Sequence, residues 1–223
     1  MATRQVLAEL TRAYAAQTGV AVEIESVGGV DAAKRVKAGE VFDLVILGSD
    51  AIDKLIASGH AHAGSRVDLV RSGVAVAVRE GSALPDISSE EAVKQAVLGA
   101  PSISYSTGPS GLALVKLFEK WGITEQIKSR LIQAPPGVPV GSLVAMGEVA
   151  LGFQQLSELL NVPGITIVGP LPDAIQITTI FSAALPTVLA KDSPRAASVQ
   201  ALLDYMVSPQ ASDAKIRQGM TPA

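Results

Sequence analysis

Short apolar, β-branched runs alternate with stretches of helical periodicity along most of this chain. The run DLVILGS (43–49) is almost continuously apolar and ends in Gly-Ser, as buried parallel strands do. The runs GVAVAVRE (73–80) and SISYS (102–106) are also predicted strands, and a helical pattern follows each of them. This alternation predicts an α/β fold with mainly parallel sheets.

The other elements follow from periodicity and from boundary residues. Further strands are predicted over 20–26, 151–155, 165–172 and 175–185. Helices are predicted over 3–18, 31–39, 50–59, 88–100, 124–132 and 142–150, after the loop 106–111, and after Pro194 and Pro209. Asp31 and Asp50 are read as helix N-caps, and Gly19 as a helix end.

Two similar α/β blocks suggest two lobes around a cleft. We expect lobe I to contain residues 1–73 and 183–223, and lobe II to contain 74–182. The chain would cross between them near 70–74 and near 178–184. Ligands of such sheets bind beyond the carboxyl ends of the strands, where helices begin.

Composition excludes several classes of protein. The chain has 223 residues, of which 48% are hydrophobic, and its net charge of −3 gives no basic field for a nucleic acid. There is no cysteine, and His60 and His62 have no further His or Cys with which to form a metal site. No run approaches the length of a membrane span, and no signal peptide is recognisable. The last point indicates a cytoplasmic protein, or a processed or truncated chain.

Four loops that follow strands share one chemistry. They are ESVGGVD (25–31), ILGSD (46–50), YSTGPSG (105–111) and GFQQLSE (152–158). Each offers backbone N–H groups and neutral side-chain donors, with no Lys or Arg inside the loop. Neutral donors at helix starts can bind an anion, because the helix ends supply positive potential. Together these loops predict a small-anion site without a metal or other cofactor.

A family resemblance rests on several segments together. They are VKAGEVFDLVILGSDAIDKLIASG, RSGVAVAVREGS, ISYSTGPSG and MGEVALGFQQLSELLNVPGITIVGPLP. Over nearly the whole chain they resemble the periplasmic molybdate-binding-like family of ABC-transporter solute receptors, in the branch that includes aconitate isomerase. The resemblance implies two Rossmann-like lobes of the type 2 periplasmic binding protein fold, closing on an oxyanion or carboxylate. It also implies a periplasmic location and an ABC-transporter permease as partner.

The resemblance carries the family's ligand loops onto particular residues. The predicted ligand-binding residues are Ser26, Gly28, Gly29, Ser106, Thr107, Ser110, Gly111, Gln154, Gln155 and Arg71. Gly28 and Gly29 stand where molybdate binders have hydroxyl donors, so we expect an organic carboxylate rather than molybdate. The family begins with a strand before its first helix, and we expect such a strand of about five to eight residues to be missing here.

Charged candidates for catalysis are few. Arg71 could pair with a carboxylate of the ligand, or bond across the hinge or to solvent. Glu25 could act as a general base if it were buried, or lie solvated at a strand end. Ser110 is the expected N-cap of the helix after the loop 106–111.

Three functions remain open on the sequence alone. The first is a solute-binding protein that holds a small anion for uptake. The alternative is an isomerase of an unsaturated tricarboxylate on the same scaffold, which needs an acid or base in its site. The third is a cytoplasmic ligand-sensing domain.

Overall fold

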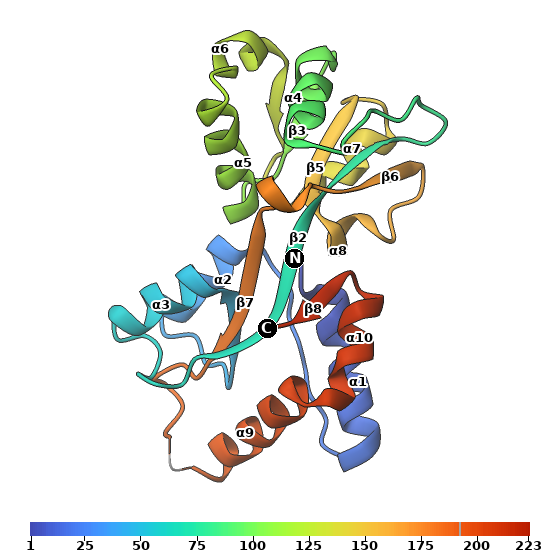
Figure 1. The fold of residues 1–223 in the computed structure, drawn as a ribbon. Coiled ribbons are helices and arrows are strands. Elements are labelled where there is room, and N and C mark those ends of the chain that lie inside the picture. The colour runs from blue at the N-terminus through green and yellow to red at the C-terminus, as the bar shows by residue number, and fades with distance from the viewer. Residues whose placement is uncertain (192) are drawn as a thin grey trace. The chain divides into compact units, whose positions relative to one another are not determined.

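The computed structural model describes residues 1–191 and 193–223 and forms two compact units (Figure 1). Unit 1 comprises Met1–Ser72 and Thr179–Ala223, and unit 2 comprises Gly73–Thr178. The chain leaves unit 1 within strand β2 (Val67–Arg79) and returns at the start of β7 (Thr178–Ala184). Each unit has its own apolar core and its own layers of helices on a sheet.

Unit 1 is a sheet covered by helices on both faces. Strand β1 (Val45–Gly48) pairs antiparallel with β7, and β8 (Met220–Pro222) pairs antiparallel with the first half of β2. One core cluster joins this sheet to α1 (Arg4–Thr18), α9 (Pro194–Val207) and α10 (Ser212–Arg217). Another joins it to α2 (Gly29–Lys37) and α3 (Ser49–Ala57). A 3₁₀ turn, η3 (Pro209–Ala211), precedes α10.

Helix ends follow the sequence in some places and differ in others. Helix α1 ends at Gly19, whose φ of 75° is left-handed, as predicted for a glycine stop. Pro194 occupies the first turn of α9. The N-caps of α2 and α3 are Gly28 and Gly48 rather than aspartates, because Asp31 and Asp50 already lie within the first helical turn.

The predicted strand over 20–26 is wrong. Residues 19–28 form neither helix nor strand, and the side chains of Val20 and Ile24 are exposed. Alternating β-branched residues form a strand only where a neighbouring strand accepts their hydrogen bonds, and β1 pairs only with β7 in the described sheet.

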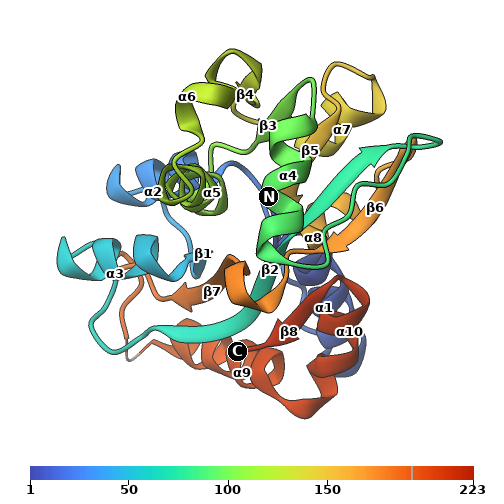
Figure 2. The same cartoon turned by 45° about the horizontal axis from the view of Figure 1, so that its top comes forward.

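Unit 2 has three layers. The second half of β2 pairs antiparallel with β5 (Leu151–Gln155) and β6 (Ile165–Pro170), while β3 (Ile103–Tyr105) lies parallel between β5 and β4 (Leu131–Gln133). Helices α4 (Glu90–Gly99), α5 (Pro109–Lys120) and α6 (Thr124–Ile127) pack on one face (Figure 2). Helices α7 (Val140–Ala145) and α8 (Leu156–Leu159) pack on the other. The sheet is therefore mixed.

Three element boundaries differ from the predictions, two in unit 2 and one at the start of β7. The helix expected over 124–132 is α6 followed by a 3₁₀ turn, η1 (Lys128–Arg130), and its last residues belong to β4. The helix expected over 142–150 ends earlier, as α7. The strand expected over 175–185 is β7, which is shorter and begins at Thr178, after a 3₁₀ turn, η2 (Asp173–Ile175).

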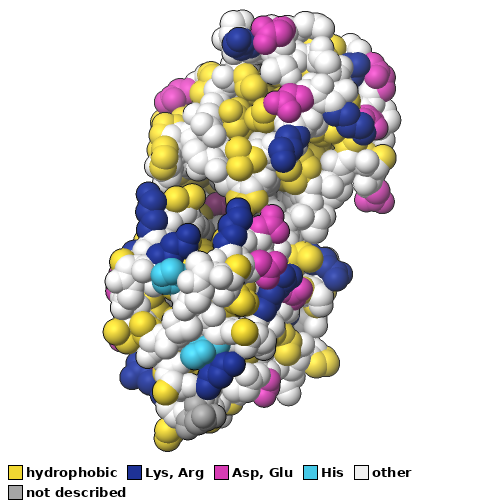
Figure 3. Space-filling model, turned by 90° about the vertical axis from the view of Figure 1, so that its left-hand side faces the viewer, with side chains coloured by type: hydrophobic (Ala, Val, Ile, Leu, Met, Phe, Trp, Pro, Cys, Tyr) yellow, Lys and Arg dark blue, Asp and Glu magenta, His cyan; other side chains and the backbone are white. Residues whose placement is uncertain are grey.

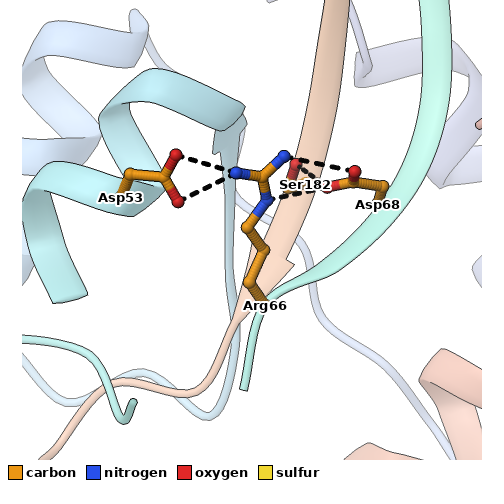
Figure 4. A network of polar contacts seen from close by, with 4 residues as sticks. All are labelled: Asp53, Arg66, Asp68 and Ser182. Atoms are coloured by element: carbon orange, nitrogen blue, oxygen red, sulfur yellow. Dashed lines mark hydrogen bonds and ion pairs between the residues drawn. The ribbon is translucent and has the colours of Figure 1, made fainter. Parts of the chain in front are cut away.

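A charged network fastens three elements of unit 1 (Figure 4). The Arg66 guanidinium donates to both carboxylate oxygens of Asp53 on α3 at 2.9 and 2.8 Å, and to Asp68 on β2 at 2.8 Å. The Ser182 hydroxyl on β7 donates to Asp68 at 2.6 Å. These bonds, led by that from Arg66, hold the pKa of Asp68 below its ordinary value.

The face drawn in Figure 3 carries acidic and basic side chains interspersed, without a continuous basic surface. Among the described residues, no helix has the length and apolarity needed to cross a membrane.

Candidate anion-binding site

Three parallel strands of unit 2 end at the same edge of its sheet. Tyr105 at the end of β3 pairs with Gln133 of β4 on one side and with Phe153 of β5 on the other. The segments that follow these strands therefore emerge together at the carboxyl edge, which we define as residues 106–111, 134–139 and 155–158. Two of these segments contain residues that the sequence predicted for ligand binding.

Helix α5 begins at this edge without the usual neutralising groups. Its N-cap is Gly108, no side chain caps its first N–H groups, and its first turn contains no acidic residue. The expectation that Ser110 is the N-cap is wrong, because Pro109 already occupies the first helical position, which its fixed φ favours. Ser110 instead lies inside the first turn, buried.

Donors around this helix start have no protein partner in the described part of the chain. The hydroxyls of Ser106, Thr107 and Ser110 make no hydrogen bond there. The same holds for the backbone N–H groups of Thr107, Gly108 and Ser110. Unused donors at the positive end of a helix are the arrangement that binds anions.

Gly111 has a packing role at the start of α5. A Cβ atom built on it would lie 1.8 Å from the carbonyl oxygen of Ser106 and 3.0 Å from the ring of Tyr105. At Gly108 a Cβ would meet only the Ser106 hydroxyl, at 3.7 Å. The lack of a side chain at Gly111 thus lets the helix approach the end of β3, which is a structural need whether or not a ligand touches it.

The two predicted glutamines end β5 and are both buried. The side-chain oxygen of Gln154 accepts from the backbone N–H of Gly141 at 3.2 Å, which fixes the start of α7. Gln155 is the residue that precedes α8. Gln154 therefore has a structural role at the start of α7, and Gln155 lies at the carboxyl edge.

Glu158 is a residue of this edge to which the sequence analysis gave no role. It lies in the first turn of α8, half-buried, beside Ser157, whose buried hydroxyl has no partner among the described residues. Burial raises the pKa of Glu158, while a hydrogen bond from Gln154 acts in the opposite direction. The sequence feature that could have pointed to Glu158 is the position of a glutamate three residues after a buried strand.

In unit 1, Ser26, Gly28 and Gly29 lie in and after the irregular segment that precedes α2. A Cβ on Gly28 would meet the Asp31 carboxylate at 3.4 Å, so an acidic group sits close to the N-terminus of α2. Helix α3 likewise has Asp50 in its first turn.

Glu25 lacks the burial that its proposed role as a general base requires. It is exposed, and Arg35 donates to both of its carboxylate oxygens at 2.7 and 2.8 Å. Hydrogen bonding to Arg35 lowers the pKa of Glu25, which weakens it as a base. Arg35 also donates to Glu40 and lies over the ring of Phe42. Glu25 is therefore part of a surface ion-pair network that attaches the segment 19–28 to α2.

Arg71 lies on β2 opposite Thr221 of β8, and its side chain is exposed. Within the described residues it forms no ion pair, so its predicted pairing with a ligand carboxylate stays a prediction. The histidines have protein partners: His60 contacts the Ser58 hydroxyl at 2.9 Å and His62 the Leu189 carbonyl at 2.7 Å. No cluster of metal-ligating side chains occurs among the described residues.

Residues 1–221 match the family model described as "Bacterial extracellular solute-binding protein". An aconitate isomerase from Pseudomonas sp. is 42% identical over 222 residues, which cover 96% of this chain and 82% of that protein. The molybdate-binding protein ModA of Azotobacter vinelandii is 32% identical over 118 residues, covering 48% of this chain and 42% of that protein.

Solved structures of the same kind match over the full length. The periplasmic molybdate-binding protein of Azotobacter vinelandii has a TM-score of 0.78 at 22% identity, covering 99% of this chain and 96% of that one. PEB3, in its L-phospholactate complex, has a TM-score of 0.76 at 13% identity, covering 100% and 96%. These likenesses confirm the predicted fold class, that of type 2 periplasmic binding proteins.

Proposed function

Because the chain belongs to the family of bacterial extracellular solute-binding proteins, we propose that it binds a small organic anion bearing carboxylate groups. In this proposal the carboxyl edge of unit 2 provides the principal donors. The protein acts in the periplasm and delivers its ligand to an ABC-transporter permease. The family membership supports the role in solute binding, and the transporter and the ligand class belong to the proposal.

One observation carries the proposal. The start of α5 combines an uncapped helix N-terminus, no acidic residue in its first turn and three hydroxyls without protein partners in the described chain. A carboxylate in front of this helix gains both the positive potential of the helix end and charge-assisted hydrogen bonds. Each such bond contributes about 1.5–3 kcal/mol to the binding free energy when the donor has no hydrogen bond within the protein to give up.

The donors favour a carboxylate over a tetrahedral oxyanion. Gln155 offers an amide with both donor and acceptor capacity at the same edge, which suits a hydroxyl or a protonated carboxyl group of an organic acid. The loop 26–29 has glycines where hydroxyl donors would serve molybdate. We therefore expect organic acids to bind more tightly than molybdate.

Calorimetry with trans-aconitate, tricarballylate and molybdate tests this function. Ser106→Ala should weaken binding of the best organic acid about tenfold or more and leave the melting temperature unchanged. Ser129→Ala, at an exposed position in η1, is the matched control and should change neither. Tight stoichiometric molybdate binding with no response to organic acids would refute the proposal.

A second candidate is an isomerase of an unsaturated tricarboxylate, and two observations favour it. One is the 42% identity to an aconitate isomerase over 96% of this chain. The other is Glu158, a half-buried carboxyl group of raised pKa at the carboxyl edge. In the reaction, a base removes a proton from the CH₂ carbon of trans-aconitate. The electron pair left on that carbon forms the new C=C bond while the old C=C bond breaks. The π pair of the old bond moves to the former vinylic carbon, which takes up a proton.

Incubation with trans-aconitate, followed by detection of the cis isomer, separates the two candidates. If the protein is an isomerase that uses Glu158 as its proton carrier, Glu158→Gln should abolish turnover while calorimetry still detects trans-aconitate binding. Binding without any turnover by the unaltered protein would leave the receptor function and exclude the isomerase. Full turnover by Glu158→Gln would exclude the role of Glu158.

A further inference from the structure

A cavity lies at the edge of the unit 2 sheet opposite the carboxyl edge. Its volume is about 580 Å³, and its lining comes from the end of β2, the end of α4 and the segments that precede β3 and β5. These are the amino ends of the parallel strands, whereas residues 106–111 follow their carboxyl ends. Strand β5 separates the two edges by roughly 13 Å, at about 3.3 Å per residue.

The cavity has an apolar floor. Val78, Val149 and Leu151 line this floor and are largely buried, and Ala96 of α4 forms part of the wall. Leu84 lies at the rim with 61% of its surface exposed. Pockets of about 300–1,000 Å³ with such walls are of the size that binds small molecules.

One cation stands at this apolar cavity. Arg79 is exposed, and a Cβ built on Gly147 would lie 3.2 Å from its guanidinium nitrogen, so the side chain lies along the wall formed by that glycine. Arg79 forms no ion pair with any described residue. Its guanidinium is available for a bidentate bond to a carboxylate.

The negative end of α4 is neutralised at the same place. The carbonyl oxygens at the end of a helix repel anions, and Gly99 and Ala100 at the end of α4 line the cavity. The Arg130 guanidinium donates to the carbonyls of Leu98, at 3.1 Å, and of Ala100. The cavity therefore combines the guanidinium of Arg79, which has no ion-pair partner among the described residues, with a helix end whose carbonyls are bonded to Arg130.

We propose that this cavity binds a small amphipathic carboxylate, with its apolar body on Val149 and Leu151 and its carboxylate on Arg79. The site is distinct from the carboxyl edge and does not depend on the function proposed there. It provides the chain with a second place at which an organic acid binds.

Fluorine NMR with para-trifluoromethylbenzoate tests the site, with para-trifluoromethylbenzyl alcohol as the uncharged control. The benzoate should give a saturable change of its fluorine signal, and the alcohol should bind at least about tenfold more weakly. Arg79→Gln should weaken benzoate binding by a similar factor. Ala96→Leu should weaken it by filling the cavity. Lys116→Gln, at an exposed position of α5, is the matched loss of charge and should have no effect.

Competition distinguishes this site from the carboxyl edge. Saturating trans-aconitate and the Ser106→Ala variant should both leave benzoate binding unchanged. Three results would each overturn the proposal. The first is the absence of a saturable signal, and the second is displacement of the benzoate by trans-aconitate. The third is binding of the benzoate by Arg79→Gln and by Ala96→Leu as tight as by the unaltered protein, at unchanged melting temperature. Failure of the organic-acid titrations at the carboxyl edge would leave these results unaffected.

Discussion

Replacing Gly111 by alanine is the sharpest test of how α5 is attached to β3. The added Cβ would lie 1.8 Å from the Ser106 carbonyl oxygen, whereas Cβ atoms in proteins essentially never lie within 3.0 Å of such an atom. The obstructing atom belongs to the backbone, so no side-chain rotation relieves the clash. Either the start of α5 or the end of β3 must move by about an ångström, which disturbs the carboxyl edge.

The expected loss is large. Overpacking by a single methyl group usually costs about 1–3 kcal/mol where neighbouring side chains can adjust. A backbone obstacle places Gly111→Ala at or above the top of that range, at about 3 kcal/mol or more in the free energy of unfolding. Gly108→Ala is the matched control, because its Cβ would meet only the Ser106 hydroxyl at 3.7 Å. It should cost about 1 kcal/mol or less, as a change of N-cap residue.

Guanidinium unfolding followed by tryptophan fluorescence measures both variants. Trp121 is the single tryptophan of the chain and follows α5 directly, with its indole N–H donating to Glu90 at 2.7 Å. The signal therefore reports on unit 2. A Gly111→Ala protein that loses less than about 1 kcal/mol, or no more than Gly108→Ala, would refute the packing argument.

Two further predictions concern unit 1. Lys215 is buried and donates to the Leu69 carbonyl at 2.8 Å, its one hydrogen-bond partner among the described residues, and burial lowers its pKa from 10.5. Lys215→Met should therefore raise the free energy of unfolding by about 1 kcal/mol near neutral pH. Because the unfolded chain binds more protons between the folded and unfolded pKa values, the unaltered protein should gain stability as pH rises through that window, and the advantage of Lys215→Met should shrink. Arg66→Met should lower the free energy of unfolding by about 1–2 kcal/mol, whereas Arg195→Met, which breaks an exposed pair, should lower it much less. Since the pKa of Asp68 is lowered in the folded protein, the cost of Arg66→Met should be present above the pKa of Asp68 in the unfolded chain and disappear as pH falls through the folded value. Urea unfolding followed by circular dichroism measures both variants. A pH-independent cost of Arg66→Met would contradict the first argument, and destabilisation by Lys215→Met would contradict the second.

Local signals in the sequence predicted local features well. The glycine stop after α1 and the proline start of α9 depend on the conformational limits of single residues, so the sequence contains them directly. The segment 20–26 failed because strand formation depends on a partner elsewhere in the chain. Strand β4 was missed because three residues behind a helical pattern carry no period of their own.

The candidate site divides in the same way. The composition of the loop identified Ser106 and its neighbours as hydrogen-bond donors, since a run of small polar residues between a strand and a helix can be recognised in the sequence. The packing of Gly111 against the Ser106 carbonyl was not predicted, because the close approach of two backbone segments cannot be inferred from residue types. Glu158 carried no sequence signal, since its raised pKa arises from burial that only the folded chain creates.

The helix starts of the two units differ in the charged groups that a bound anion would meet. Asp31 and Asp50 place a carboxylate in the first turns of α2 and α3, where it already interacts with the positive helix end and repels a second anion. Helix α5 has no such group. At the same edge, burial raises the pKa of Glu158. A carboxylate therefore meets donors at the start of α5 and like charge at the starts of α2 and α3, which is why we assign its principal contacts to unit 2.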